Sequence, residues 1–167
     1  MVNSVINEVN EKAKIIEEVV DKLVSNYCKP LDDFMVMIRE VLDDKANPPT
    51  DEELESMALK LPNLLYFTGE AVESLGIKGD IAEQVKMDLY HSIHLSTSGT
   101  MADKHAMAEQ GTQSQQLVKI SYERAYKKIK LRMEAGYEML ASVKKVLSRR
   151  LLELQLTFQS HGGKTYE

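Results

Sequence analysis

The chain of 167 residues has few of the residues that interrupt helices or build disulfide frameworks: four prolines, eight glycines, one cysteine and no tryptophan. Scarce proline and glycine, with abundant Glu, Lys, Leu, Met and Ala, favour helix almost throughout. A single Cys28 excludes an internal disulfide, so a reducing, cytoplasmic compartment is expected. We find neither a signal peptide nor an apolar run of membrane-spanning length, so no membrane partner is expected.

Signatures of catalysis and metal binding are also missing. Asp88, His91 and His94 are spaced three residues apart, but no HExxH motif or cysteine cluster accompanies them, so no metal site is expected. The Gly162–Thr165 stretch lacks the upstream glycine, strand and helix of a phosphate-binding loop. We therefore expect a protein that is not an enzyme and needs no cofactor.

The predicted fold class is all-α: short N-terminal helices followed by a helical hairpin with a very long C-terminal helix, assembled as an oligomeric bundle. Hydrophobic residues make up 43 % of the chain, enough for a core. We expect an acidic N-terminal helical region over residues 1–79, the hairpin over 80–160 and a flexible tail over 161–167.

Apolar periodicity and capping residues predict helices over six ranges: 3–27, 31–44, 50–61, 63–75, 80–95 and 101–160. Thr50 and Glu53 have the spacing of a capping box. Pro30 and Pro62 are expected to end helices, and Gly76 to supply a left-handed stop. Residues 96–100 are predicted to be a loop, and the range 101–160 is one helix or two segments that meet at residues 110–116.

An apolar stripe runs along the predicted C-terminal helix at about 3.6 residues per step. A straight helix of roughly sixty residues would be about 90 Å long, more than a compact domain of this size, so we expect it to pack against other subunits. The residues predicted to mediate oligomerisation are Val118, Tyr122, Ile129, Met133, Leu140, Val143, Leu147, Leu151 and Leu154.

Positive charge is concentrated in the same helix. The whole chain has a net charge of −5, whereas residues 117–152 hold ten Lys and Arg against three Glu, a net charge of +7. Residues 1–116 hold ten Lys and Arg against 21 Asp and Glu, a net charge of −11. A local cationic surface can neutralise phosphates even on an acidic protein.

A helical projection places most of these cations opposite the apolar stripe, with two tyrosines at the edge of the cationic arc. Phosphates would contact the cations while unstacked bases lie on the aromatic rings, each stack contributing about 1–3 kcal/mol without sequence preference. The residues predicted to bind single-stranded nucleic acid are Lys119, Arg124, Tyr126, Lys127, Lys130, Tyr137, Lys144, Lys145 and Arg149. No helix-turn-helix, zinc-finger or RRM signature is present, so base-specific reading of duplex DNA is not expected.

Two other interpretations of these residues remain open. The basic residues could simply keep a long helix soluble, and a tyrosine beside an apolar seam is often the edge of a core. Alternatively, the chain is a structural or adaptor protein whose basic helix docks an acidic protein partner.

The layout of residues 82–154 resembles the UvsY family of phage recombination mediators. Four passages carry the resemblance: Glu83–Tyr90, the small loop Ser96–Thr100, Ala102–Glu109 and Leu140–Leu147. The resemblance implies an all-helical accessory protein that helps to load a recombinase onto single-stranded DNA and assembles into rings, in the host cytoplasm if phage-encoded. It also implies DNA contacts at Lys86, Tyr90 and His91, although one firm positive charge there departs from the family's basic pattern.

Overall fold

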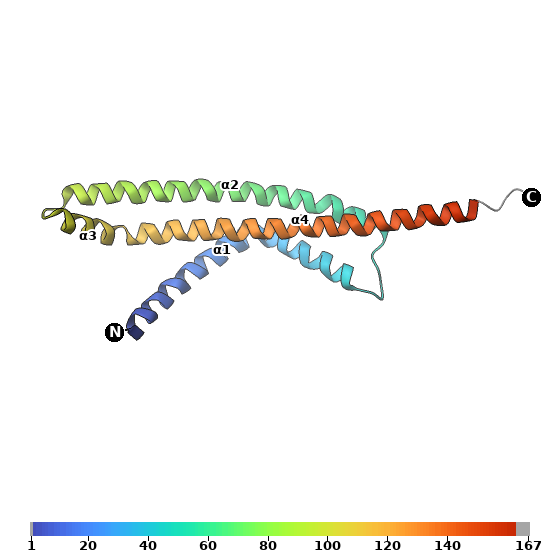
Figure 1. Ribbon diagram of the computed structural model, residues 1–167, viewed down its shortest axis with the longest axis horizontal. Coiled ribbons are helices and arrows are strands. Elements are labelled where there is room, and N and C mark those ends of the chain that lie inside the picture. The colour runs from blue at the N-terminus through green and yellow to red at the C-terminus, as the bar shows by residue number, and fades with distance from the viewer. Residues whose placement is uncertain (1, 163–167) are drawn as a thin grey trace, which may run out of the picture. The chain divides into compact units, whose positions relative to one another are not determined.

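Four α-helices account for the part of the chain that the computed structural model describes, residues 2–162 (Figure 1). They are α1 (Val2–Asp43), α2 (Asp51–Ser96), α3 (Met101–Gly111) and α4 (Gln113–Gly162). No residue of this range lies in a strand, which confirms the all-α prediction. Residues 163–167 of the predicted tail lie outside the described residues, and the two before them belong to α4.

The helices are fewer and longer than predicted, because neither Pro30 nor Pro62 ends one. Pro30 lies inside α1 and Pro62 inside α2. Both prolines are exposed, whereas their neighbours Leu31 and Leu61 are buried. The prolines therefore lie on the solvent side of their helices, and apolar packing of the adjacent leucines holds each helix together.

The predicted stop at Gly76 and the predicted new start at Asp80 are also wrong, since α2 continues through both residues. Among the described residues, positive φ occurs at Gly99, with φ of 132°, in the loop between α2 and α3. The left-handed conformation that glycine tolerates is therefore used there. Leu75, beside Gly76, is buried in a core, so tertiary packing favours an uninterrupted helix at this point.

The capping box predicted at Thr50 and the loop predicted at residues 96–100 are confirmed. The Thr50 amide donates to Glu53 Oε2 at 2.7 Å, and the Glu53 amide donates to Thr50 Oγ1 at 3.2 Å, so α2 begins with a capping box. The predicted loop at residues 96–100 is also found, with α2 ending at Ser96 and α3 starting at Met101. The long C-terminal range is divided at Thr112, whose hydroxyl donates to the Ala108 carbonyl at 2.9 Å.

The chain forms two compact units. Unit 1 comprises residues 1–28 and 69–131, and unit 2 comprises residues 29–68 and 132–167. The sequence position expected to separate the N-terminal region from the hairpin, between residues 79 and 80, lies inside α2 in unit 1. Each unit has its own buried cluster, drawn from α1, α2 and α4.

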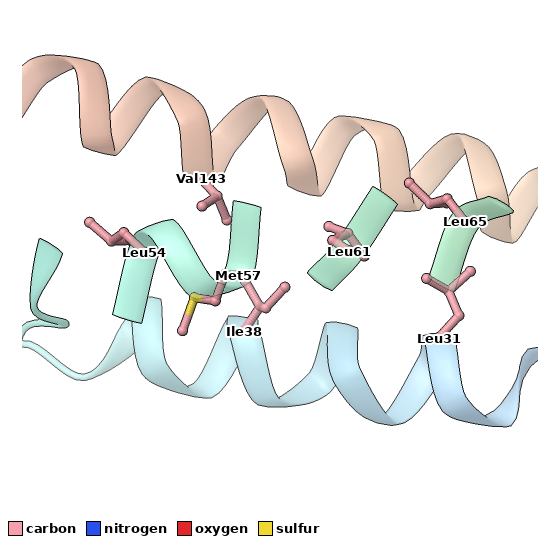
Figure 2. Close-up of a cluster of buried hydrophobic side chains, with 7 residues drawn as sticks. All are labelled: Leu31, Ile38, Leu54, Met57, Leu61, Leu65 and Val143. Carbon is pink, nitrogen blue, oxygen red and sulfur yellow. The ribbon is translucent and has the colours of Figure 1, made fainter. Parts of the chain in front are cut away.

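The core of unit 2 is formed by side chains from three helices (Figure 2). Its fully or nearly fully buried members are Leu31 and Ile38 of α1, Leu54, Met57, Leu61 and Leu65 of α2, and Val143 of α4. Gly136 allows α4 to approach closely, because a Cβ atom at this position would lie 2.7 Å from Leu65 Cδ2. The core of unit 1 consists of Val20, Val24, Cys28, Leu75, Ala125 and Ile129.

Most of the stripe assigned to oligomerisation packs within the chain instead. Ile129 and Val143 are completely buried in the two cores, which corrects their assignment to a subunit interface. Other members pack against the cores while remaining partly exposed: Tyr122, Met133, Leu140 and Leu147. The physical reason is that α1 and α2 cover this face of α4. The three stripe residues left exposed are Val118, Leu151 and Leu154, at 49 %, 51 % and 46 %.

Candidate nucleic-acid interface

The ten basic residues of the range 117–152 fall into two groups of five. One group forms ion pairs with carboxylates of the same chain: Lys119, Lys128, Arg132, Arg149 and Arg150. The other group is exposed and has no ion pair within residues 2–162: Arg124, Lys127, Lys130, Lys144 and Lys145. The second group retains its full capacity to bind an external anion.

A groove of unit 1 brings several cations together along α1 and α4. The groove has a volume of about 640 Å³. Arg124, Lys127 and Lys128 line it, and its apolar wall is formed by Ala13, Ile16, Val20, Ile120 and Leu131. Glu17 and Asp21 of α1 also line the groove, and Lys128 Nζ lies 2.5 Å from Asp21 Oδ1. The cations therefore border an apolar trough in which part of their charge is already neutralised.

Lys119 is held inside unit 1 and does not face solvent freely. Its Nζ lies 2.7 Å from Glu83 Oε2 and 3.6 Å from Glu123 Oε1. The hydrogen bond from Lys119, followed by that from Lys86, lowers the pKa of Glu83, and the hydrogen bond to Glu83 raises the pKa of Lys119. Lys119 therefore contributes to the packing of α4 on α2. Its ammonium group is already paired with carboxylates, so it is not free to bind a phosphate as predicted.

The two tyrosines of the predicted row have different surroundings. Tyr126 is partly buried against the core of unit 1. Its ring is also close to Gly76, where a Cβ atom would lie 3.7 Å from Tyr126 Cε2. One part of this ring is thus used in packing, as expected of a core edge. Tyr137, in unit 2, is exposed and available for stacking.

Among the predicted binding residues in unit 2, Lys144 and Lys145 are exposed. Arg149 is also exposed, and its Nε lies 2.9 Å from Glu153 Oε1 one helical turn later. Such exposed pairs contribute little to stability, so Arg149 can exchange Glu153 for another anion. These residues supply a second, smaller set of cations in their own unit.

The positions implied by the family resemblance are occupied by intramolecular contacts. Lys86 donates to Glu83 at 3.2 Å and to Gln116 at 3.0 Å. The Tyr90 hydroxyl lies 2.5 Å from His105 Nδ1. Lys86 and Tyr90 are both half-buried, whereas His91 is exposed. The structure therefore gives Lys86 and Tyr90 roles in the packing of unit 1.

Two features of this region were not anticipated from the sequence. Glu17 and Asp21 face the cations of α4 although about a hundred residues separate them along the chain. His94 and His105 come together at the junction of α2 and α3, with ring centroids 4.8 Å apart. No local motif signals either arrangement, since both depend on how helices pair.

Within residues 2–162 no group of three or more His, Cys, Asp and Glu is placed to hold a metal ion, and no helix is long and apolar enough to cross a bilayer. Of the residues spaced three apart on α2, Asp88 accepts a hydrogen bond from Gln84 at 2.9 Å, and His91 is exposed. The sequence matches no protein-family model, no curated protein and no solved structure.

Proposed function

We propose that this chain is a non-enzymatic, homo-oligomeric accessory protein of recombination or replication that binds single-stranded DNA. The observation that carries the proposal is the groove of unit 1, where Arg124 and Lys127 are exposed without an ion pair in the described chain and border an apolar wall. Lys130, also exposed, adds a further cation in that unit.

A flexible polyanion fits this arrangement better than a rigid duplex does. Phosphates would neutralise the ammonium and guanidinium groups and release counterions, while the apolar wall of the groove would favour unstacked bases. Tyr137, in unit 2, offers a separate exposed ring for stacking. The net charge of −5 disfavours adhesion of DNA to the remainder of the protein. Binding would therefore depend on a few cations and would show little sequence preference.

Fluorescence anisotropy with a labelled single-stranded oligonucleotide tests the proposal. Affinity should fall steeply with salt, with a slope of log K against log salt of about −0.7 per neutralised phosphate. The variant Lys127→Glu, Lys130→Glu, Lys144→Glu and Lys145→Glu should lose binding. A matched control reverses four other exposed lysines: Lys22, Lys29, Lys45 and Lys60.

Both variants change the net charge by the same amount, so the comparison separates a local surface from the overall charge. The control variant should keep most of the affinity. Absence of binding by the wild-type protein at low salt, or equal loss in the two variants, would contradict the proposal.

A second candidate is the adaptor function, in which the basic residues dock an acidic protein segment. It is favoured by the carboxylates that already contact these residues, Asp21 at Lys128 and Glu83 at Lys119. Competition distinguishes the two candidates. If poly-glutamate displaces the oligonucleotide at an equal concentration of charge, the surface selects anions in general, and the adaptor function gains support.

A further inference from the structure

The junction of α2 and α3 gathers three rings of unit 1. Tyr90 and His94 come from the last two turns of α2, and His105 comes from α3. The ring centroids of His94 and His105 are 4.8 Å apart, and the Tyr90 ring stacks on His94 with centroids 6.1 Å apart and an interplanar angle of 16°. Two imidazoles therefore lie next to each other at this junction.

The nitrogen atoms of these imidazoles are unequally satisfied. The Tyr90 hydroxyl lies 2.5 Å from His105 Nδ1, so this contact occupies one nitrogen of His105 and leaves Nε2 for another ligand. His94 Nε2 is buried and has no hydrogen-bond partner among the described residues. A buried imidazole nitrogen without a partner calls for an explanation, and a bound ion supplies one.

We propose that His94 and His105 bind a divalent transition metal ion, with zinc as the representative member of the class. Each Zn–N bond is about 2.0 Å long, so two imidazoles that bind one ion at a tetrahedral angle have ring centres about 5 Å apart. The observed separation of 4.8 Å matches this arrangement. Imidazole nitrogens suit Zn²⁺, Cu²⁺ and Ni²⁺ and do not suit Mg²⁺ or Ca²⁺.

Tyr90 acts as a positioning residue at this site. A histidine that binds a metal through one nitrogen usually has its other nitrogen fixed by a hydrogen bond, which sets the tautomer and the orientation of the ring. In the metal-bound form, His105 Nδ1–H donates to the Tyr90 oxygen, and the lone pair of Nε2 is left for coordination. The protein supplies two ligands, so the remaining positions go to solvent or to another small ligand.

The segment between the two histidines is fixed without any metal. The Thr97 amide and hydroxyl donate to the Ile93 carbonyl at 3.0 and 2.7 Å, closing the end of α2. The Thr100 amide donates to Asp103 Oδ2 at 3.0 Å, and the Asp103 amide donates to Thr100 Oγ1 at 3.3 Å. Little conformational freedom is therefore lost when an ion links the two helices.

Titration of the full-length protein with ZnCl₂ by isothermal calorimetry, combined with melting curves, tests the site. We expect one Zn²⁺ per chain and a rise in Tm on binding. His105→Ala should lower the affinity at least tenfold, and since His105 is exposed the variant should fold. Tyr90→Phe should weaken binding by about 10-fold, the lower end of the usual range for such supporting residues.

The chain offers a matched control because it contains four histidines. The variant His91→Ala and His161→Ala removes the other two and should bind Zn²⁺ as tightly as the wild-type protein. His94→Ala, or His94→Gln if the alanine variant unfolds by circular dichroism, should lose binding as His105→Ala does. No Zn²⁺ binding by the wild-type protein, unchanged affinity in His105→Ala, or loss in the control variant would overturn the proposal.

Discussion

Glu83 of α2 forms ion pairs with two lysines, and Lys119 of α4 is the closer, with 2.7 Å between its Nζ and Glu83 Oε2. The second lysine, Lys86, lies one turn along α2 at 3.2 Å from Oε1. This contact ties a residue from the most basic part of the sequence to the acidic part within unit 1. The charge asymmetry of the chain is thus partly resolved inside the folded unit.

Glu83→Gln should lower the stability of the protein at neutral pH in a pH-dependent way. The pKa of Glu83 is lowered in the folded state, so its contribution is present above the ordinary value of about 4.3 and is lost as the pH falls through the lowered value. The variant should therefore melt a few degrees lower than the wild-type protein at pH 7 and at the same temperature at strongly acidic pH. Circular dichroism melts at a series of pH values measure this difference.

The exposed Glu70 of α2 provides the control for this series. Glu70→Gln makes the same chemical change without removing an ion pair seen in residues 2–162, so its Tm should follow the wild-type value across the series. If the Tm of Glu83→Gln stays below the wild-type Tm by the same amount from neutral to acidic pH, the ion pair does not stabilise the fold.

Leu61→Ala should be strongly destabilising, because Leu61 is completely buried in the core of unit 2. Removing a buried leucine side chain costs about 2–5 kcal/mol in the free energy of unfolding. Leu59, two residues earlier on α2, is 73 % exposed, and Leu59→Ala should change stability by less than about 0.5 kcal/mol. Urea unfolding of both variants checks the contrast, and similar losses would mean that α2 packs through a different face.

Features that depend on neighbouring residues could be predicted from the sequence. The capping box of Thr50 and Glu53 and the loop at residues 96–100 are specified by side chains within a few positions. The effect of Pro30 could not be predicted in this way. It depends on whether the interrupted side of the helix faces water, which only the packing around Leu31 decides.

The candidate site was also predicted only in part: the exposed face of α4 was predicted, and its contacts with other helices were not. Periodicity correctly separated exposed cations such as Lys127 and Lys130 from buried residues such as Ile129. It could not show that Asp21 would face Lys128 or that Tyr126 would pack against a core, because both contacts join segments distant in sequence. Periodicity identifies the buried face of a helix and leaves its covering partner undetermined.

Asp21→Asn should increase the affinity for single-stranded DNA if the proposed function is correct. The substitution removes the carboxylate that pairs with Lys128 in the groove of unit 1 and leaves that ammonium group to a phosphate. We expect a several-fold gain in affinity and a salt slope steeper by about 0.7. Because both partners are largely exposed, folding should be unaffected.

Glu18, exposed on α1 and outside the groove lining, provides a control of equal charge change. Anisotropy titrations of Asp21→Asn and Glu18→Gln should separate a local effect from a general reduction of negative charge. Equal gains in DNA affinity in the two variants would show that Asp21 has no specific effect on the groove. This conclusion would hold even if the wild-type protein binds DNA.

The variant Leu151→Ser and Leu154→Ser should weaken self-association. Both leucines are about half exposed, and Leu156 and Phe158 on the same part of α4 are more exposed still. Leu151, Leu154 and Phe158 follow the spacing of one helix face, and the proposed homo-oligomer would bury these exposed apolar side chains. Light scattering after size exclusion should show a lower mass for the variant, with little effect of salt because the contact is apolar.

Leu59→Ser and Leu95→Ser remove two other highly exposed leucines and should leave the mass unchanged. A monomeric wild-type protein, or equal masses for all three proteins, would exclude this end of α4 as the contact between subunits.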